Sequence, residues 1–220
     1  MHLCALTRSS MQARQVFTAY DRDLASKDLA PNDLAPKQSW TFCPACGSAL
    51  LAPGREAERK CSRINCDFVL YRNPVPIVAV LIVDGDRFLL CRRKPDTFEG
   101  GKWCLPCGYM DYHEDFLTAG RREVKEETGL DVEITGLLSV ASNFLRPDIH
   151  TLAIALLAEI RGGVMRAGDD VDRLGWFSLG GELPAFAFPA DRHMVERYFA
   201  TGSSGAPVDL AYAGARLHRE

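Results

Sequence analysis

Residues 108–130 read GYMDYHEDFLTAGRREVKEETGL, and this stretch decides the fold of the domain around it. It fills every position of the pattern G-x5-E-x7-R-E-U-x-E-E-x-G-U, in which U is a bulky aliphatic residue. The matching residues are Gly108, Glu114, Arg122, Glu123, Val124, Glu126, Glu127, Gly129 and Leu130. With average residue frequencies, a chance match of this length is on the order of one in ten million. The stretch therefore predicts a specific site.

The second half of this stretch is expected to be a helix over Phe116–Thr128, because it lacks proline and is rich in Arg, Glu and Lys. Asp115 can cap the start of the helix, and Gly129 can end it with a left-handed residue. The residues that fall on its packing stripe are Leu117, Val124 and Thr128.

Three carboxylates share another face of this helix, since Glu123, Glu126 and Glu127 lie at i, i+3 and i+4. Their mutual repulsion costs several tenths of a kcal/mol per pair, and a bound cation would reverse that cost. Oxygen ligands without His or Cys favour Mg²⁺ or Mn²⁺. The alternative is a solvated acidic face, which the flanking Gly108 and Glu114 disfavour.

Four cysteines show the spacing of metal ligands, because Cys43-Pro-Ala-Cys46 is followed after fourteen residues by Cys61-Ser-Arg-Ile-Asn-Cys66. Four thiolates at this spacing predict a closed, structural Zn²⁺ site that performs no chemistry. The alternative of four core cysteines is disfavoured, since a segment of about 30 residues cannot stabilise itself by burial alone. The basic residues of the segment alternate with Glu56 and Glu58, so direct binding of nucleic acid is not expected.

The chain is expected to divide into four parts: a disordered or linker tail at 1–40, a zinc ribbon at 41–72, an α/β domain at 75–200, and a flexible tail at 201–220. Within the α/β domain, the apolar run Ile77–Val83, the turn Asp84-Gly85 and the segment Arg87–Arg93 predict a hairpin. The other candidate elements are an apolar run at Thr151–Ile160, a short strand at Leu174–Phe177 and a helix at Arg192–Phe199.

Composition bounds the class of protein. With 220 residues, 47% hydrophobic, the chain can bury one core and a small appendage, and its net charge of −3 argues against a nucleic-acid-binding surface. No apolar run approaches about 18 residues, so no membrane helix is expected. The cysteine pattern favours a reducing, cytoplasmic setting. Arg8 and Arg14, with no acid in the first twenty residues, weakly resemble an organelle presequence; the alternative is a disordered tail, with Met11 as a rival initiator.

The stretch at 108–130 resembles the Nudix box, and a zinc ribbon ahead of it resembles the zinc-ribbon Nudix hydrolases. That group includes pyrophosphatases of NADH, ADP-ribose and FAD, and the resemblance covers about residues 40–200. It implies an α/β/α sandwich with a mixed sheet, metal binding by the three glutamates, and a plausible ribbon-mediated homodimer. It also implies that Arg122 and Glu114 orient the loop and the metal ligands, while Gly108 permits close backbone approach.

The resemblance further implies an acid outside the box that binds a metal or activates water. In NADH-pyrophosphatase-like enzymes a glutamate lies six residues before an aromatic pair such as Trp176-Phe177, and Asp170 occupies that spacing here. Asp169 is the second candidate, and a simple acidic turn is the alternative.

The expected reaction is hydrolysis of the diphosphate in nucleoside diphosphates linked to another moiety. ADP-ribose or FAD is favoured because Ser139–His150 lacks the array of NADH pyrophosphatases, while Pro147 lies near the proline position of ADP-ribose pyrophosphatases. Phe144 is a candidate for stacking on adenine. NADH, NAD or NAD-capped RNA is the alternative substrate, and a non-catalytic Nudix nucleotide sensor is the rival of another class. The complete box disfavours that rival.

Overall fold

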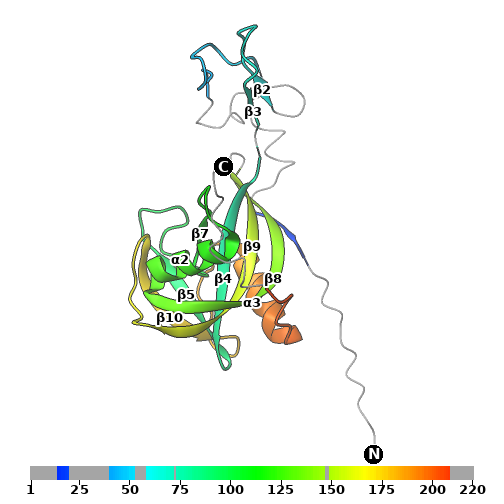
Figure 1. Ribbon diagram of the computed structural model, residues 1–220. Helices are drawn as coiled ribbons and strands as arrows, with labels where there is room; N and C mark the ends of the chain where they lie inside the picture. The colour runs from blue at the N-terminus through cyan, green and yellow to red at the C-terminus, as the bar shows by residue number, and fades with distance from the viewer. Residues whose placement is uncertain (1–13, 20–39, 53–57, 72, 147–148, 209–220) are drawn as a thin grey trace, which may run out of the picture. The chain divides into compact units, whose positions relative to one another are not determined.

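A computed structural model describes residues 14–19, 40–52, 58–71, 73–146 and 149–208 (Figure 1). Contacts divide the chain into two compact units. The first contains Met1–Phe17, Pro76–Asn143 and Leu152–Glu220, and the second contains Thr18–Val75 and Phe144–Thr151. None of the helices in the described residues is long and apolar enough to cross a membrane.

The first unit is built on a sheet whose strands follow the order β1-β8-β9-β4-β5-β10, with β6 paired to β5 and β7 paired to β4. Their bounds are β1 Val16–Thr18, β4 Val75–Asp84, β5 Arg87–Arg93, β6 Trp103–Cys104, β7 Cys107–Tyr109, β8 Leu130–Arg146, β9 Ile149–Gly163 and β10 Val171–Ser178. Strand pairs such as β4 with β5 are antiparallel, whereas an isolated bridge between Trp103 and Phe186 is parallel.

A helix covers each face of this sheet. Successive residues of β4 belong to different clusters: Val80 packs with residues of helix α2, Phe116–Thr128, whereas Leu81 packs with residues of helix α3, Pro189–Thr201. Because strand side chains alternate between faces, α2 and α3 lie on opposite sides of the sheet. The predicted α/β/α sandwich is confirmed, and Figure 1 shows both helices against the strands.

Helix α2 has the bounds and caps that the sequence predicted. The carboxylate of Asp115 accepts the N–H groups of Leu117 and Thr118 at 2.9 and 3.0 Å. Gly129 ends the helix at φ 73°, and its N–H donates to the carbonyl of Lys125. Leu117, Val124 and Thr128 are buried as expected. Local chemistry at both ends therefore fixes where the helix starts and stops.

The predicted hairpin is also present, since β4 and β5 pair through Val83 with Phe88 and Asp84 with Arg87. The other three candidate elements lie inside β9, β10 and α3. The longest of the strands that were not predicted is β8. Strand β8 is 17 residues long, and polar residues such as Ser142 and Asn143 interrupt the apolar alternation that identifies strands in a sequence.

Both ends of the chain hold order that the predicted tails did not include. Residues 16–18 form β1, where Phe17 is buried against Ala141 and Ala190, although they lie within the segment predicted to be a disordered or linker tail. Burying this ring offsets the entropy of ordering a short strand. Beyond α3, Ala206 and Leu137 exchange two backbone hydrogen bonds of 2.8 and 2.9 Å. The flexible tail therefore stays a prediction only for 209–220, which lie outside the described residues.

The second unit contains the cysteine segment. Its strands β2, Arg59–Lys60, and β3, Val69–Leu70, form an antiparallel pair. The buried Cys43, Leu50 and Cys61 pack with the half-buried Cys46 and Cys66. The hydrophobic centre of this segment is therefore largely made of the cysteines themselves.

Candidate functional site

The glutamates of α2 differ in burial. Glu123 and Glu127 are 6% and 1% exposed, whereas Glu126 is exposed to solvent. The carboxylate of Glu123 lies against β7, where a Cβ built on Gly108 would fall 2.3 Å from its Cδ. Any residue larger than glycine at this position would displace the carboxylate. The close approach expected of Gly108 therefore has a direct steric basis.

Glu127 is a buried carboxylate with few polar partners to offset the loss of water around its charge. The N–H of Cys107 donates to its Oε2 at 3.1 Å. Burial raises the pKa of Glu127 well above its usual range, and the neighbouring Cys104 and Asp170 raise it further. A buried carboxylate with one weak donor is costly unless a cation lies near it.

Arg122 connects the glutamates to the preceding loop. Its Nε and Nη2 donate to both oxygens of Glu114 at 2.7 and 2.8 Å. Its Nη1 donates to Glu123 at 2.8 Å and to Glu126 at 3.0 Å, and its Nη2 also reaches the carbonyl of Tyr109 at 2.9 Å. The hydrogen bond from Arg122 lowers the pKa of Glu114. One guanidinium therefore sets the position of three carboxylates.

The two aspartates that follow β9 lie beside this helix. The N–H of Gly168 donates to the carbonyl of Glu127 at 3.1 Å, so the loop packs on the end of α2. Asp170 accepts a hydrogen bond from Nη2 of Arg93 at 2.7 Å, and its charge contributes to the raised pKa of Glu127. The charge of Asp169 acts instead on Glu123. The structure thus brings both candidate acids to the glutamates.

Arg93 was missed by the sequence-based prediction. It stands at the end of β5, its side chain is 12% exposed, and it pairs with Asp170 from 77 residues away. Its Nε also donates to the carbonyl of Phe98 at 2.7 Å. The only available signal was a basic residue at the end of an apolar strand, and that pattern is too common to indicate a site.

Two observations fit this site to a divalent cation. Glu127 is buried and accepts one backbone N–H, and the Oδ1 of Asp170 is buried without a hydrogen-bond partner in the described part of the chain. Both offer hard oxygen atoms, which Mg²⁺ and Mn²⁺ prefer. The glutamate oxygens form no group within 4.8 Å of one another among the described residues, although the same Nη1 of Arg122 binds Glu123 and Glu126.

The four predicted thiols of the second unit do converge. The Sγ atoms of Cys43, Cys46, Cys61 and Cys66 all lie within 4.8 Å of one another, the only such group of three or more candidate ligands among the residues described. The Sγ–Sγ distances are 3.8 Å for Cys43 with Cys66 and 3.4 Å for Cys46 with Cys61. A tetrahedral site with metal–sulfur bonds of about 2.3 Å requires about 3.8 Å. The thiols therefore fit a tetrahedral metal ion.

Local backbone chemistry supports this arrangement. Gly47 adopts φ 72°, and its N–H donates to the carbonyl of Cys43 at 2.8 Å, which closes the tight turn after the first pair. Hydrogen bonds from Ser48 lower the pKa of Cys46 to about 6. The N–H of Arg63 donates to the sulfur of Cys61 at 3.4 Å. Such donors favour thiolates, which are the form that binds metal, whereas burial and the neighbouring thiols raise the pKa of Cys61 and of Cys66.

The expected substrate contacts find less support. Phe144 stacks on His150 with ring centroids 3.9 Å apart, so one face of its ring is already covered. Pro147 lies outside the described residues.

The sandwich and the helix that carries its buried glutamates define a domain of Nudix type. A model of the family described as NUDIX domain matches residues 73–198, and the chain belongs to this family of hydrolases.

The relatives agree with this assignment. The chain is 36% identical over 124 residues to an ADP-ribose pyrophosphatase of Methanocaldococcus jannaschii, a match that covers 56% of this chain and 72% of that protein. It is 29% identical over 162 residues to the NAD-capped RNA hydrolase NudC of Stutzerimonas stutzeri, with 72% of this chain and 56% of that protein covered. The chain thus spans little more than half the length of this second relative.

A solved structure extends the similarity. A NUDIX hydrolase from Nitrosomonas europaea superimposes with a TM-score of 0.64 at 26% identity, covering 76% of this chain and 95% of that one.

Proposed function

We propose that the protein hydrolyses the diphosphate of nucleoside diphosphates linked to a second moiety, with ADP-ribose or FAD as the preferred substrate. The observation that carries this proposal is the buried carboxylate of Glu127 beside Asp170, at the end of a helix whose complete box belongs to a hydrolase family. A non-catalytic sensor would not need these uncompensated carboxylates, which cost stability unless a cation binds them.

In this proposal Glu123, Glu126 and Glu127 hold Mg²⁺ or Mn²⁺, with Asp170 or Asp169 as a further ligand or base. A bound divalent cation would neutralise the diphosphate and lower the pKa of an attacking water. Arg122 and Glu114 act as positioning residues through the hydrogen bonds described above.

The four cysteines hold a structural Zn²⁺ in the proposal. The convergence of their sulfurs supports it.

The preference for ADP-ribose is supported by the activity named for the Methanocaldococcus relative, and the chain covers 72% of that protein. It is supported also by residues 139–150, which lack the array of NADH pyrophosphatases.

NADH, NAD or NAD-capped RNA is the second candidate. The match to the NAD-capped RNA hydrolase favours it, because that match covers 72% of this chain against 56% for the ADP-ribose pyrophosphatase. That match is longer, at 162 residues against 124, but its identity is lower, at 29% against 36%.

A substrate panel tests the proposal. ADP-ribose, FAD, NADH, NAD, a deoxynucleoside triphosphate and NAD-capped RNA are assayed with Mg²⁺ and with Mn²⁺. We expect kcat/KM for ADP-ribose or FAD to exceed that for NADH by about tenfold, which corresponds to about 1.4 kcal/mol of transition-state binding. A preference for NADH or capped RNA would select the second candidate. A preference for the triphosphate would overturn the substrate class.

A further inference from the structure

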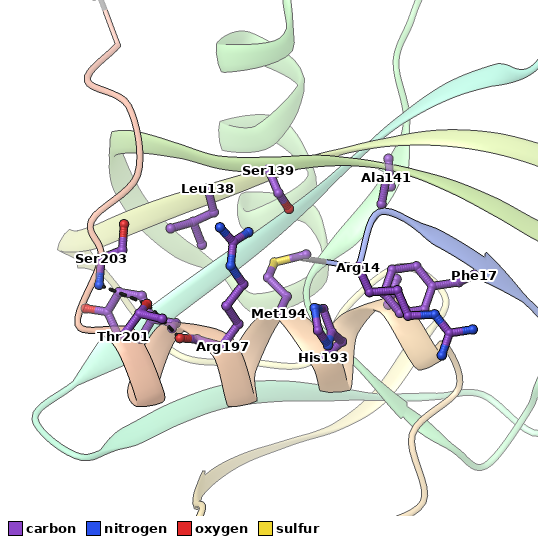
Figure 2. A pocket seen from close by; sticks show the side chains of 13 residues that line it. Arg14, Phe17, Leu138, Ser139, Ala141, His193, Met194, Arg197, Thr201 and Ser203 are labelled. Atoms are coloured by element: carbon purple, nitrogen blue, oxygen red, sulfur yellow. Dashed lines mark hydrogen bonds between the residues drawn. The ribbon is translucent and has the colours of Figure 1, made fainter. Parts of the chain in front are cut away.

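The pocket beside α3 and β8 is small (Figure 2). Arg14, Met194 and Arg197 contribute to its lining, whereas none of the glutamates of α2 does. Its volume of about 30 Å³ is the space of about one water molecule. The pocket therefore offers no room for a nucleotide, and the polar groups that bear on the proposed reaction lie around α2.

Two neighbouring arginines at the end of β5 each form an ion pair with an aspartate beside the start of β10. Arg92 donates from Nε and Nη2 to the two carboxylate oxygens of Asp172 at 2.7 and 3.0 Å. Arg93 donates from Nη2 to the Oδ2 of Asp170 at 2.7 Å. Val171 lies opposite Arg93 in the pairing of the two strands, so the aspartates flank this position. The chain therefore holds two arginine–aspartate pairs of the same kind at one junction of strands.

The two pairs differ in how completely the carboxylate is satisfied. Both oxygens of Asp172 accept a hydrogen bond from Arg92. The Oδ1 of Asp170, in contrast, is buried and has no hydrogen-bond partner among the residues that the structure describes. Taking a carboxylate oxygen out of water without a partner costs free energy, which a bound cation would offset. The pair of Arg92 is complete by itself, whereas the pair of Arg93 leaves one oxygen for a ligand.

Arg93 is held on several sides. Its side chain is 12% exposed, and its Nε donates to the carbonyl of Phe98 at 2.7 Å. Its guanidinium lies 5.7 Å from the ring centroid of Phe188. The main chain of Asp170 is anchored to the same end of β5, because the N–H of Lys94 donates to its carbonyl at 2.8 Å. These contacts leave the carboxylate of Asp170 little freedom to rotate.

The loop that carries Asp170 also packs on the glutamate helix. The N–H of Gly168 donates to the carbonyl of Glu127 at 3.1 Å, and a Cβ built on Gly168 would fall 2.4 Å from the carbonyl oxygen of Glu126. This close approach places Asp170 near the last turn of α2. Asp169, the other candidate acid, is exposed to solvent. Of the two candidates, Asp170 therefore combines a fixed position with an unsatisfied oxygen.

We infer that Arg93 is a positioning residue of the proposed reaction, which fixes the Oδ2 of Asp170 and leaves its Oδ1 as the further ligand of Mg²⁺ or Mn²⁺. This assigns the acid outside the box to Asp170 and gives Asp169 no role as a ligand. The inference rests on the proposed function, in which the glutamates of α2 hold the same cation. Arg93 acts through Asp170, and Arg92 has no part in the site.

Binding of Mn²⁺ to the full chain, followed by electron paramagnetic resonance, tests this inference without turnover. The binding that is lost in Glu127→Gln defines the site. Arg93→Met should weaken Mn²⁺ binding there by about tenfold or more, the scale of losing a residue that orients a metal ligand. Arg92→Met is the matched control, because it removes the neighbouring pair with Asp172 and should leave the affinity unchanged. Equal Mn²⁺ affinity in the two variants would overturn the role of Arg93.

A double-mutant cycle separates positioning from a general loss of structure. Asp170→Asn should weaken Mn²⁺ binding at least as much as Arg93→Met does, and Asp169→Asn should not. Adding Arg93→Met to Asp170→Asn should cause little further loss, because Arg93 acts through that carboxylate. Full addition of the two losses, or a larger loss in Asp169→Asn, would contradict the inference. If circular dichroism shows that Arg93→Met does not fold, Arg93→Lys takes its place in the cycle, with a smaller loss expected because the charge is retained.

The same measurements distinguish failure of the inference from failure of the proposed function. A parent chain that hydrolyses its substrate, while Arg93→Met matches Arg92→Met in Mn²⁺ affinity, would overturn the role of Arg93 alone. A parent chain that binds Mn²⁺ through Glu127 and hydrolyses nothing in the substrate panel would overturn the proposed function alone.

Discussion

The thiol cluster of the second unit and the carboxylate cluster of α2 present metal ligands in different ways. The four sulfurs already lie within 4.8 Å of one another, held by turns and N–H donors of the backbone. The carboxylates form no such group among the described residues: Arg122 bridges Glu123 and Glu126, and the buried Glu127 accepts a backbone N–H. A complete ligand set suits a structural ion, whereas an incomplete set leaves room for water and substrate oxygens. In the proposed function, the thiol cluster is therefore the stabilising site and the carboxylate cluster is the reactive one.

Removal of a thiol ligand should give the largest effect. We expect about one zinc per chain by elemental analysis of protein purified without added metal. Cys43→Ser should lose this zinc and expose residues 40–71 to proteolysis, because metal binding supplies about 10 kcal/mol or more to such segments. Hydrolysis per folded chain should persist.

Cys91→Ala is the control for this variant. Cys91 is buried outside the cluster, so this substitution should leave the zinc in place. Zinc-free protein with unchanged resistance to proteolysis would show that the cluster is an ordinary cysteine core.

Asp191 is a buried carboxylate that belongs to neither cluster. It therefore tests whether burial alone is enough for a carboxylate to bind a metal ion. It is 4% exposed, it accepts the N–H of Leu105 at 3.0 Å, and burial raises its pKa from 3.8 to about 7. The folded protein then holds a proton between these values that the unfolded chain releases, so stability falls as pH rises from about 4 to 7. Asp191→Asn should remove this slope, which amounts to at most about 4 kcal/mol.

Urea unfolding of both proteins at pH 5 and pH 8 measures the difference. The concentration of Mg²⁺ needed for activity should not change in Asp191→Asn, because this carboxylate already has a backbone partner. An identical pH dependence in the two proteins would mean that Asp191 is ionised in the folded state.

Glu127→Gln tests the reactive site itself. The amide keeps the shape of the side chain and removes the negative charge, so turnover should fall by at least about 10²-fold while the fold is retained. Steady-state assays at saturating Mg²⁺ measure this loss, with circular dichroism as the check on folding. Glu133→Gln is a suitable control because Glu133 forms an exposed ion pair with Arg161. Full activity in Glu127→Gln, or in excess EDTA, would rule out metal-dependent hydrolysis at this helix.

The sequence predicted the parts of both sites that depend on local spacing. The cap at Asp115, the end of α2 at Gly129 and the spacing of the four cysteines are short-range patterns, and each corresponds to a contact in the structure. Contacts between distant segments carry no such signal. Arg93 reaches Asp170 across 77 residues, and strand β1 pairs with β8 and buries a single aromatic residue, Phe17.

The pocket beside α3 shows the same limit. Arg14 was considered as part of a presequence-like segment, yet it lines a pocket with Arg197 from the opposite end of the chain. The sequence alone does not show what a charged residue near a terminus contacts, because the fold decides which element lies beside it. Prediction from the sequence therefore succeeded for motifs and did not extend to the surfaces that the fold assembles.

Arg122→Lys should produce the smallest effect and is the sharpest test of the contrast between the two clusters. Lysine keeps the charge but lacks the planar fork that reaches Glu114, Glu123 and Glu126 together. If the carboxylates depend on this fork for their positions, the Mg²⁺ concentration for half-maximal activity should rise by about tenfold, the scale of losing a partner that orients metal ligands.

The maximal rate in Arg122→Lys should change less than the Mg²⁺ requirement, since the ligands themselves remain. Arg121→Lys, the same substitution one position earlier, serves as the control because Arg121 forms no ion pair within the described residues. Equal Mg²⁺ requirements in both variants would show that helix α2 alone positions its carboxylates, as the backbone turns position the thiols. A raised requirement in Arg122→Lys alone would show that the reactive site depends on a side-chain network that the structural site does not need.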